Sequence, residues 1–362
     1  MRTANAKPSG IKKHKKPQFS PKASRIKSAQ TALVKAQAVA MGRDNDGECS
    51  LKETQKKQII ARLNGYCVQE SFESIISRLA PCHRKTILLK LTTAFLFKLV
   101  VEEFFDHPSW YAEIPPEHED RCARTPWKGV TPDGAVFEKF LSKFEGVNPE
   151  YSRLWRCTTS RIFHALYPEV EDNPKFVQAL KARREARCRS LAKETLAIKS
   201  FQHLLKPTTS TEQDLLRKQG LGACLFKVAE IAVAISTQNP VLKFKTLHEL
   251  EPRFDHLSEE VEADHQHRLD DGDPRLDGHH VLFIYHPFVY RMENDFEPED
   301  TIRVAKAVAV MEKDCSASSE DSETIPNVTG ETVGEKTSTS EEKQAAGKTK
   351  KTAKKTKRKT TG

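Results

Sequence analysis

One apolar run stands out along this chain: residues 87–105, which read ILLKLTTAFLFKLVVEEFF. Lys90 and Lys98 interrupt it, and Glu102 and Glu103 lie near its end. The spacing of Lys90, Lys98 and Glu102 in multiples of four places these three along one narrow edge of a helix. A helix that is apolar on almost every side is buried among other elements. We therefore expect a central core helix that ends near His107, because the proline that follows disfavours helix at that residue.

Apolar residues recur with helical spacing in several other segments. We expect helices within 50–80, 133–146, 149–168, 174–205 and 221–235. Gly65 and Tyr66 break the first segment, and Pro81 ends it. Residues 108–132 form a proline-rich loop, whose aromatic side chains we expect to pack on the helices: Trp110, Tyr111 and Trp127.

Two segments near the end of the patterned region have the composition of strands. Residues 280–292 (HVLFIYHPFVYRM) are rich in aromatic and β-branched side chains, and residues 301–311 alternate valine with alanine. With a turn at Asn294–Asp295 they form a hairpin, although Glu299–Thr301 equally suits the start of a helix. The predicted fold is mainly α: an irregular helical bundle with a small C-terminal β-hairpin, flanked by disordered tails.

The positive charge of the chain is confined to its ends. The net charge is +9, yet residues 1–43 carry eleven Lys/Arg and residues 348–362 carry eight, with no acid in either segment, so residues 44–347 carry −10. Segments this polar bury too little apolar surface to fold. We predict a disordered basic tail (1–49), one mainly helical domain (50–312) with a polar loop (254–280), and a disordered acidic, then Lys-rich tail (313–362).

The basic tails contain two Lys-rich clusters, which are candidates for nuclear import or for non-specific contact with DNA or RNA. They comprise Lys12, Lys13, Lys15, Lys16, Lys350, Lys351, Lys354, Lys355, Lys357, Arg358 and Lys359. Alternative interpretations are a solubilising tail and, for the N-terminal cluster, an organelle transit peptide. We expect a nuclear protein, with the cytoplasm as the alternative and the mitochondrion as a third. No membrane partner is expected, because charges interrupt the central apolar run.

The polar segment 247–286 holds seven of the thirteen histidines. His265, His267, His279 and His280 are weak metal-ligand candidates among several aspartates, but their spacing fits no known metal motif, and a surface loop has the same composition. The eight cysteines form no Cys-x-x-Cys pair, and no Gly-x-Ser-x-Gly elbow is present. The sequence indicates no catalytic residue and no cofactor.

A resemblance to predicted fungal proteins of unknown function covers roughly residues 85–310. It rests on Leu154-Trp155-Arg156 in a mid-chain helix, followed by the polar stretch and a strand that ends in His286-Pro287. The resemblance implies one helical domain with a small β element near its end, and no activity or site.

Two functions are compatible with these features. The first is a non-enzymatic interaction protein, with a helical core for an unidentified protein partner and Lys-rich tails for nucleic acid or nuclear import. The alternative is a metal-dependent enzyme centred on residues 264–280.

Overall fold

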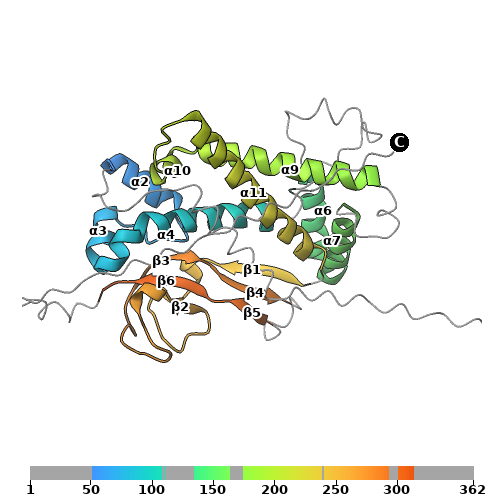
Figure 1. Ribbon diagram of the computed structural model, residues 1–362. Helices are drawn as coiled ribbons and strands as arrows, with labels where there is room; N and C mark the ends of the chain where they lie inside the picture. The colour runs from blue at the N-terminus through green and yellow to red at the C-terminus, as the bar shows by residue number, and fades with distance from the viewer. Residues whose placement is uncertain are drawn as a thin grey trace, which may run out of the picture. The chain divides into compact units, whose positions relative to one another are not determined.

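Helices make up most of the residues that this computed structural model describes, which are 51–107, 110, 134–163, 174–238, 240–292 and 301–313. The helical elements are α2 (Glu53–Arg62), α3 (Phe72–Arg78), α4 (Pro81–Val100), the π-helix η1 (Val101–Phe105), α6 (Gly134–Val147), α7 (Pro149–Phe163), α9 (Pro174–Ala197), α10 (Lys199–Leu204), α11 (Thr211–Ser236) and the 3-10 turns η4 (Leu247–Glu249) and η5 (His265–His267) (Figure 1). The prediction of a mainly helical fold is confirmed. The predicted disordered tails lie outside the described residues, except for Lys313.

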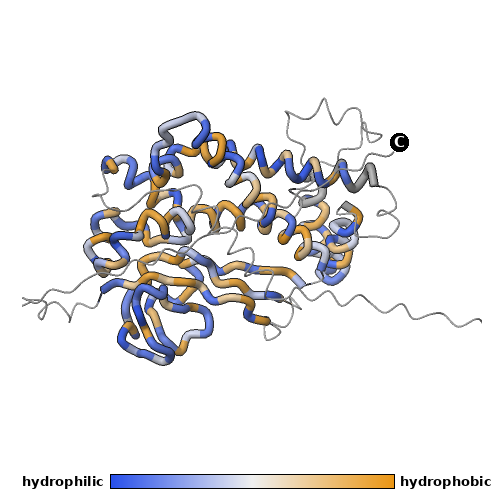
Figure 2. The backbone as a smooth tube through the Cα atoms, in the orientation of Figure 1, coloured by the Kyte–Doolittle hydropathy of each residue, from blue (hydrophilic) through white to orange (hydrophobic). Residues whose placement is uncertain are grey.

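The helix α4 is the core element that the apolar run predicts. Thirteen of its twenty residues are buried. One side packs on the strand β3 (Val281–His286), where the ring of Phe97 lies 4.5 Å from that of His286. The other side packs on α10, where Phe95 lies 4.8 Å from Phe201. Figure 2 shows the apolar character of this helix, in contrast to the mostly polar surface helix α9.

The ends of two helices differ from the expectation. Pro81 does end the preceding pattern, but it is also the first residue of α4, where its missing N–H costs nothing. The single helix expected over 174–205 is wrong, since Ile198 is extended and separates α9 from α10. This break turns Phe201 and Leu204 into the core, where both are fully buried.

The described strands form two three-stranded sheets, β1-β4-β5 and β2-β6-β3. They are β1 (Val241–Lys245), β2 (Val261–Ala263), β3, β4 (Phe288–Met292), β5 (Thr301–Ala305) and β6 (Ala307–Met311). The predicted hairpin is present. One arm consists of β3 and β4 and the other of β5 and β6. Strand β3 pairs antiparallel with β6, and β4 pairs antiparallel with β5, so 301–311 is strand. The expectation of a hairpin alone is wrong, because β1 and β2 add a strand to each sheet. The turn predicted at Asn294–Asp295 lies outside the described residues.

Arginine side chains of α7 cap the C-terminal end of α11. Arg156 donates to the carbonyl oxygens of Ser236 and Gln238 at 3.2 and 3.1 Å, and Arg161 donates to that of Thr237 at 2.9 Å. The carbonyls of Ser236 and Thr237 belong to the last turn of α11, which a helix leaves without internal partners. By length and composition α11 is the one helix in the described part that could cross a membrane. Half of its most apolar window is buried in the fold, and core helices of soluble proteins pass the same test.

Of the three aromatic residues expected to pack on the helices, Trp110 is described. It is buried and meets the ring of Phe104 edge-on, with 4.8 Å between the ring centres. The other two, Tyr111 and Trp127, lie outside the described residues.

Candidate functional site

A buried cluster of polar side chains joins the polar loop to α4. Its centre is Asp264, which follows β2 and caps the short helix η5 by accepting a hydrogen bond from the backbone N–H of Gln266 at 2.8 Å. The carboxylate is fully buried and accepts two further bonds, from the ammonium of Lys90 at 2.9 Å and from the hydroxyl of Tyr285. We call Asp264, Lys90, His83, Gln266 and Tyr285 the polar joint.

Each donor of the Lys90 ammonium has an acceptor within the polar joint. Besides Asp264, the acceptors are Nδ1 of His83 at 2.7 Å and Oε1 of Gln266 at 2.9 Å. Because an ammonium only donates, Nδ1 of His83 must be unprotonated, and the neutral ring carries its hydrogen on Nε2. That Nε2 is buried and has no hydrogen-bond partner in the described part of the chain.

The protonation states in the polar joint follow from burial and charge. Burial raises the pKa of Asp264, but the hydrogen bonds from Tyr285 and Lys90 outweigh it, and the pKa lies below its ordinary value. Burial lowers the pKa of Lys90, although the bond to Asp264 opposes the shift. Burial and the charge of Lys90 lower the pKa of His83 to about 4. We infer a buried ion pair beside a neutral imidazole.

His267, one of the predicted metal candidates, extends the polar joint. Its ring centre lies 4.1 Å from that of His83, and its Nε2 accepts a hydrogen bond from the backbone N–H of Met311 at 3.2 Å. Burial lowers its pKa to about 3. His267 therefore packs between α4 and β6, and its Nε2 already has a donor.

The other three predicted metal candidates have separate surroundings. The side chain of His265 is 82% exposed. Nδ1 of His279 lies 3.2 Å from the carbonyl oxygen of Glu312, and the backbone N–H of His280 donates to the carboxylate of that same residue at 3.1 Å. Within the described ranges the four histidines do not converge on one point.

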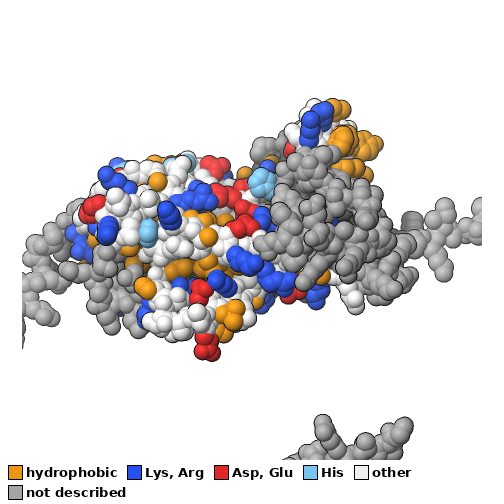
Figure 3. Space-filling view, turned by 90° about the horizontal axis from the view of Figure 1, so that it is seen from above, with side chains coloured by type: hydrophobic (Ala, Val, Ile, Leu, Met, Phe, Trp, Pro, Cys, Tyr) orange, Lys and Arg blue, Asp and Glu red, His pale blue; other side chains and the backbone are white. Residues whose placement is uncertain are grey.

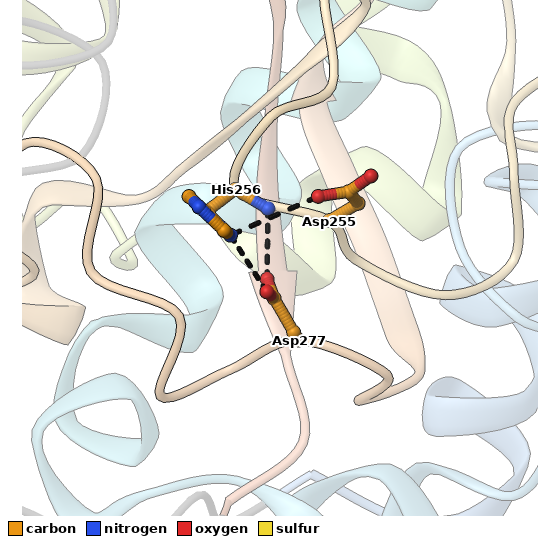
Figure 4. Close-up of side chains that lie close together, drawn as sticks. All are labelled: Asp255, His256 and Asp277. Carbon is orange, nitrogen blue, oxygen red and sulfur yellow. Dashed lines mark hydrogen bonds and ion pairs between the residues drawn. The ribbon is translucent and has the colours of Figure 1, made fainter.

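The described residues bring one group of three ligand side chains together, and it lies at the ends of the polar loop. Asp255, His256 and Asp277 each offer a ligand atom within 4.8 Å of the other two (Figure 4). Nδ1 of His256 lies 2.6 Å from Oδ2 of Asp277 and 3.8 Å from Oδ1 of Asp255. Asp277 belongs to the segment that the sequence indicates. Asp255 and His256 precede that segment by eight or more residues, and no sequence spacing marks them.

A cavity of about 360 Å³ lies beside η1, α7, α11 and β1. Its lining includes the aromatic rings of Phe104 and Phe105 and charged groups of both signs, among them Asp106, Arg156 and Lys243. Burial raises the pKa of Asp106. A cavity of this size suits a small molecule, but the mixed charges select no class of ligand.

The candidate nucleic-acid residues of both Lys-rich clusters lie outside the described residues. No family model, no curated protein and no solved structure matches this chain. The resemblance to fungal proteins of unknown function therefore stays a prediction.

Proposed function

We propose that this protein is a non-enzymatic, nuclear interaction protein whose Lys-rich ends hold nucleic-acid phosphates and whose helical domain binds a protein partner. The observation that carries the proposal is the segregation of charge. The two acid-free ends hold 19 of the 59 Lys and Arg residues, whereas residues 44–347 are net negative. Phosphate backbones attract unpaired cations without regard to sequence.

The arginines of the domain give a second reason to assign phosphate contact to the ends. The densest basic stretch of the folded region is residues 181–193, and three of its four arginines face acids: Arg184 pairs with Glu230, Arg187 with Glu103, and Arg189 with Glu185, at 2.9–3.0 Å. Figure 3 shows Lys, Arg, Asp and Glu side chains interspersed on the helical face. Positive and negative charges at such short distances weaken the electrostatic field that would attract a phosphate backbone.

The helices α6 and α7 offer the surface that suits a protein partner. Their large apolar side chains are unusually exposed, with Val147 at 86%, Tyr151 at 69% and Leu154 at 55%. Phe140 and Phe144 continue the patch along α6 and are also exposed. Apolar side chains that gather on a surface mark interaction sites more often than single exposed ones do.

Neutralising the C-terminal cluster is expected to weaken binding to a DNA duplex of arbitrary sequence about tenfold at 100 mM salt, because released counterions drive such binding. The variant carries Gln at the seven basic positions from Lys350 to Lys359. For every phosphate that the variant no longer neutralises, the plot of log K against log salt becomes shallower by about 0.9. Fluorescence anisotropy over a salt series measures both quantities.

The control for this experiment exchanges Arg187 and Arg189 for Gln, which removes charge from the paired surface of the domain. We expect its affinity to stay within about twofold of the wild type. Equal affinity and slope in the wild type and the tail variant would contradict the role of the C-terminal cluster.

Nuclear import is testable apart from nucleic-acid binding. Fused to a fluorescent reporter too large to enter the nucleus by diffusion, residues 1–43 or 343–362 are expected to concentrate it there, because import receptors bind short Lys/Arg-rich segments. Gln at Lys12, Lys13, Lys15 and Lys16 should abolish the effect of the N-terminal segment. A cytoplasmic distribution of both fusions would argue against an address in the tails, and a mitochondrial one would favour the transit-peptide alternative.

A further inference from the structure

The ends of the polar loop are fixed next to each other by backbone hydrogen bonds. The N–H of Phe254 donates to the carbonyl oxygen of His279 at 2.9 Å, and the N–H of Gly278 donates to that of Phe254 at 2.8 Å. Asp255 and His256 directly follow Phe254 in the chain, and Asp277 directly precedes Gly278. The three side chains therefore start from a frame that does not depend on a ligand, and Figure 4 shows them turned toward one another.

Hydrogen bonds to the backbone also orient both carboxylates. The N–H of His256 donates to Oδ1 of Asp277 at 2.8 Å, and the N–H of Leu257 donates to Oδ1 of Asp255 at 2.9 Å. Bonds of this kind hold ligand side chains in place around protein metal sites. They leave Oδ2 of Asp277 directed at the imidazole.

Charge indicates what these side chains would bind. Asp264 is paired with Lys90, and Asp273 with Arg275 at 2.7 Å. Among the described residues neither Asp255 nor Asp277 has a Lys or Arg partner, and the imidazole of His256 is the one basic group beside them. The two carboxylates carry a charge of −2 around a point that a divalent cation would neutralise.

The distances are close to those of a zinc site. Zinc lies about 2.0–2.2 Å from nitrogen and oxygen ligands, so that tetrahedral ligand atoms are about 3.3 Å apart. Nδ1 of His256 is 2.6 Å from one carboxylate oxygen and 3.8 Å from the other. Shifts of roughly 0.5–0.7 Å bring these two distances to that value, and all three ligand atoms lie within 4.8 Å of one another.

We propose that Asp255, His256 and Asp277 bind one divalent first-row transition-metal ion, and Zn²⁺ is the ion used to test the site. The bound ion links the two ends of the segment 257–276. The metal takes the place of the hydrogen on Nδ1 of His256 that otherwise bridges to Asp277, and the neutral ring then carries its one hydrogen on Nε2. Solvent supplies the remaining ligands, because Asp255 and Asp277 are exposed.

The test uses the full chain, freed of metal by a chelator and kept reduced so that thiols do not oxidise. Isothermal titration with Zn²⁺ is expected to show one ion bound per chain, and saturation should raise Tm by several degrees, since the ion binds the folded state alone. Asp255→Asn should weaken binding at least tenfold and remove the Tm shift. Its amide oxygen still accepts from Leu257, so its metal-free Tm should match the wild type.

Two further variants distinguish this site from adventitious binding to the other histidines. His256→Ala should lose the site, whereas His265→Ala, which removes an exposed imidazole outside the group, should keep it. The proposal is overturned if the wild type binds no stoichiometric ion, if Asp255→Asn and His256→Ala bind Zn²⁺ as tightly as the wild type, or if His265→Ala loses as much affinity as they do.

Discussion

Replacing Asp264 with alanine is expected to lower the free energy of unfolding by about 3–5 kcal/mol, because it leaves the ammonium of Lys90 buried without its counter-charge. The hydroxyl of Tyr285 and the backbone N–H of Gln266 also lose their acceptor. Urea unfolding followed by circular dichroism measures the loss. Adding Lys90→Met to this variant should recover part of the stability, since the unpaired charge is then gone.

A surface ion pair of the same length provides the matched control. Glu185 and Arg189 are 2.9 Å apart, as are Asp264 and Lys90, but both side chains are at least half exposed. Glu185→Ala should therefore cost about 0.3–0.5 kcal/mol. If Asp264→Ala cost no more than this control, the polar joint would not be an essential part of the fold.

The domain is also expected to lose several kcal/mol of stability as the pH falls from about 6.5 to about 4. Burial lowers the pKa of His83 and His286 to about 4, and that of His267 to about 3. In this window the unfolded chain binds protons on these rings and the folded chain does not, so acid favours unfolding. Asp264 adds to the effect only at lower pH, because its pKa is held below 3.8.

Thermal unfolding between pH 7.5 and pH 4.5 tests this expectation. His286→Phe is the informative variant, because the ring of His286 packs against Phe97 and its Nε2 has no hydrogen-bond partner among the described residues. Phenylalanine keeps the packing and removes the titration, so the slope of Tm against pH should become shallower. His265→Gln, at an exposed position, should leave the slope unchanged. A Tm at pH 5 equal to that at pH 7.5 would show that the rings of His83, His267 and His286 do not govern acid stability.

The parts of the fold that the sequence predicts are those with long or strongly patterned segments. The apolar run of α4 has enough consecutive residues to identify a core helix, and the pair 280–292 and 301–311 has clear strand composition. The strands β1 and β2 are five and three residues long. Their pairing partners lie far away in sequence, so no local pattern marks them. The break at Ile198 has no glycine or proline to mark it in the sequence, and Phe201, three residues after it, is fully buried.

The polar joint is visible in the sequence only as separate residues. Lys90 interrupts the apolar run, and the sequence correctly indicates a polar edge there. A single sequence does not show which of the many acids of the polar loop pairs with Lys90. The pair between Lys98 and Glu102 is predictable because both lie on one helix face, and it forms at 3.7 Å. Asp255, His256 and Asp277 come together through backbone bonds between distant segments, which spacing alone does not reveal.

The position of β6 has a consequence for synthesis on the ribosome. This strand is the last described element, yet it lies between β2 and β3 in its sheet. Roughly 200 residues separate the end of the core helix from β6, which corresponds to about 10–40 s of translation. During that time the face of α4 that will meet the completed sheet is exposed on the nascent chain. The protein should therefore depend on chaperones that hold apolar helices until translation of the domain is complete.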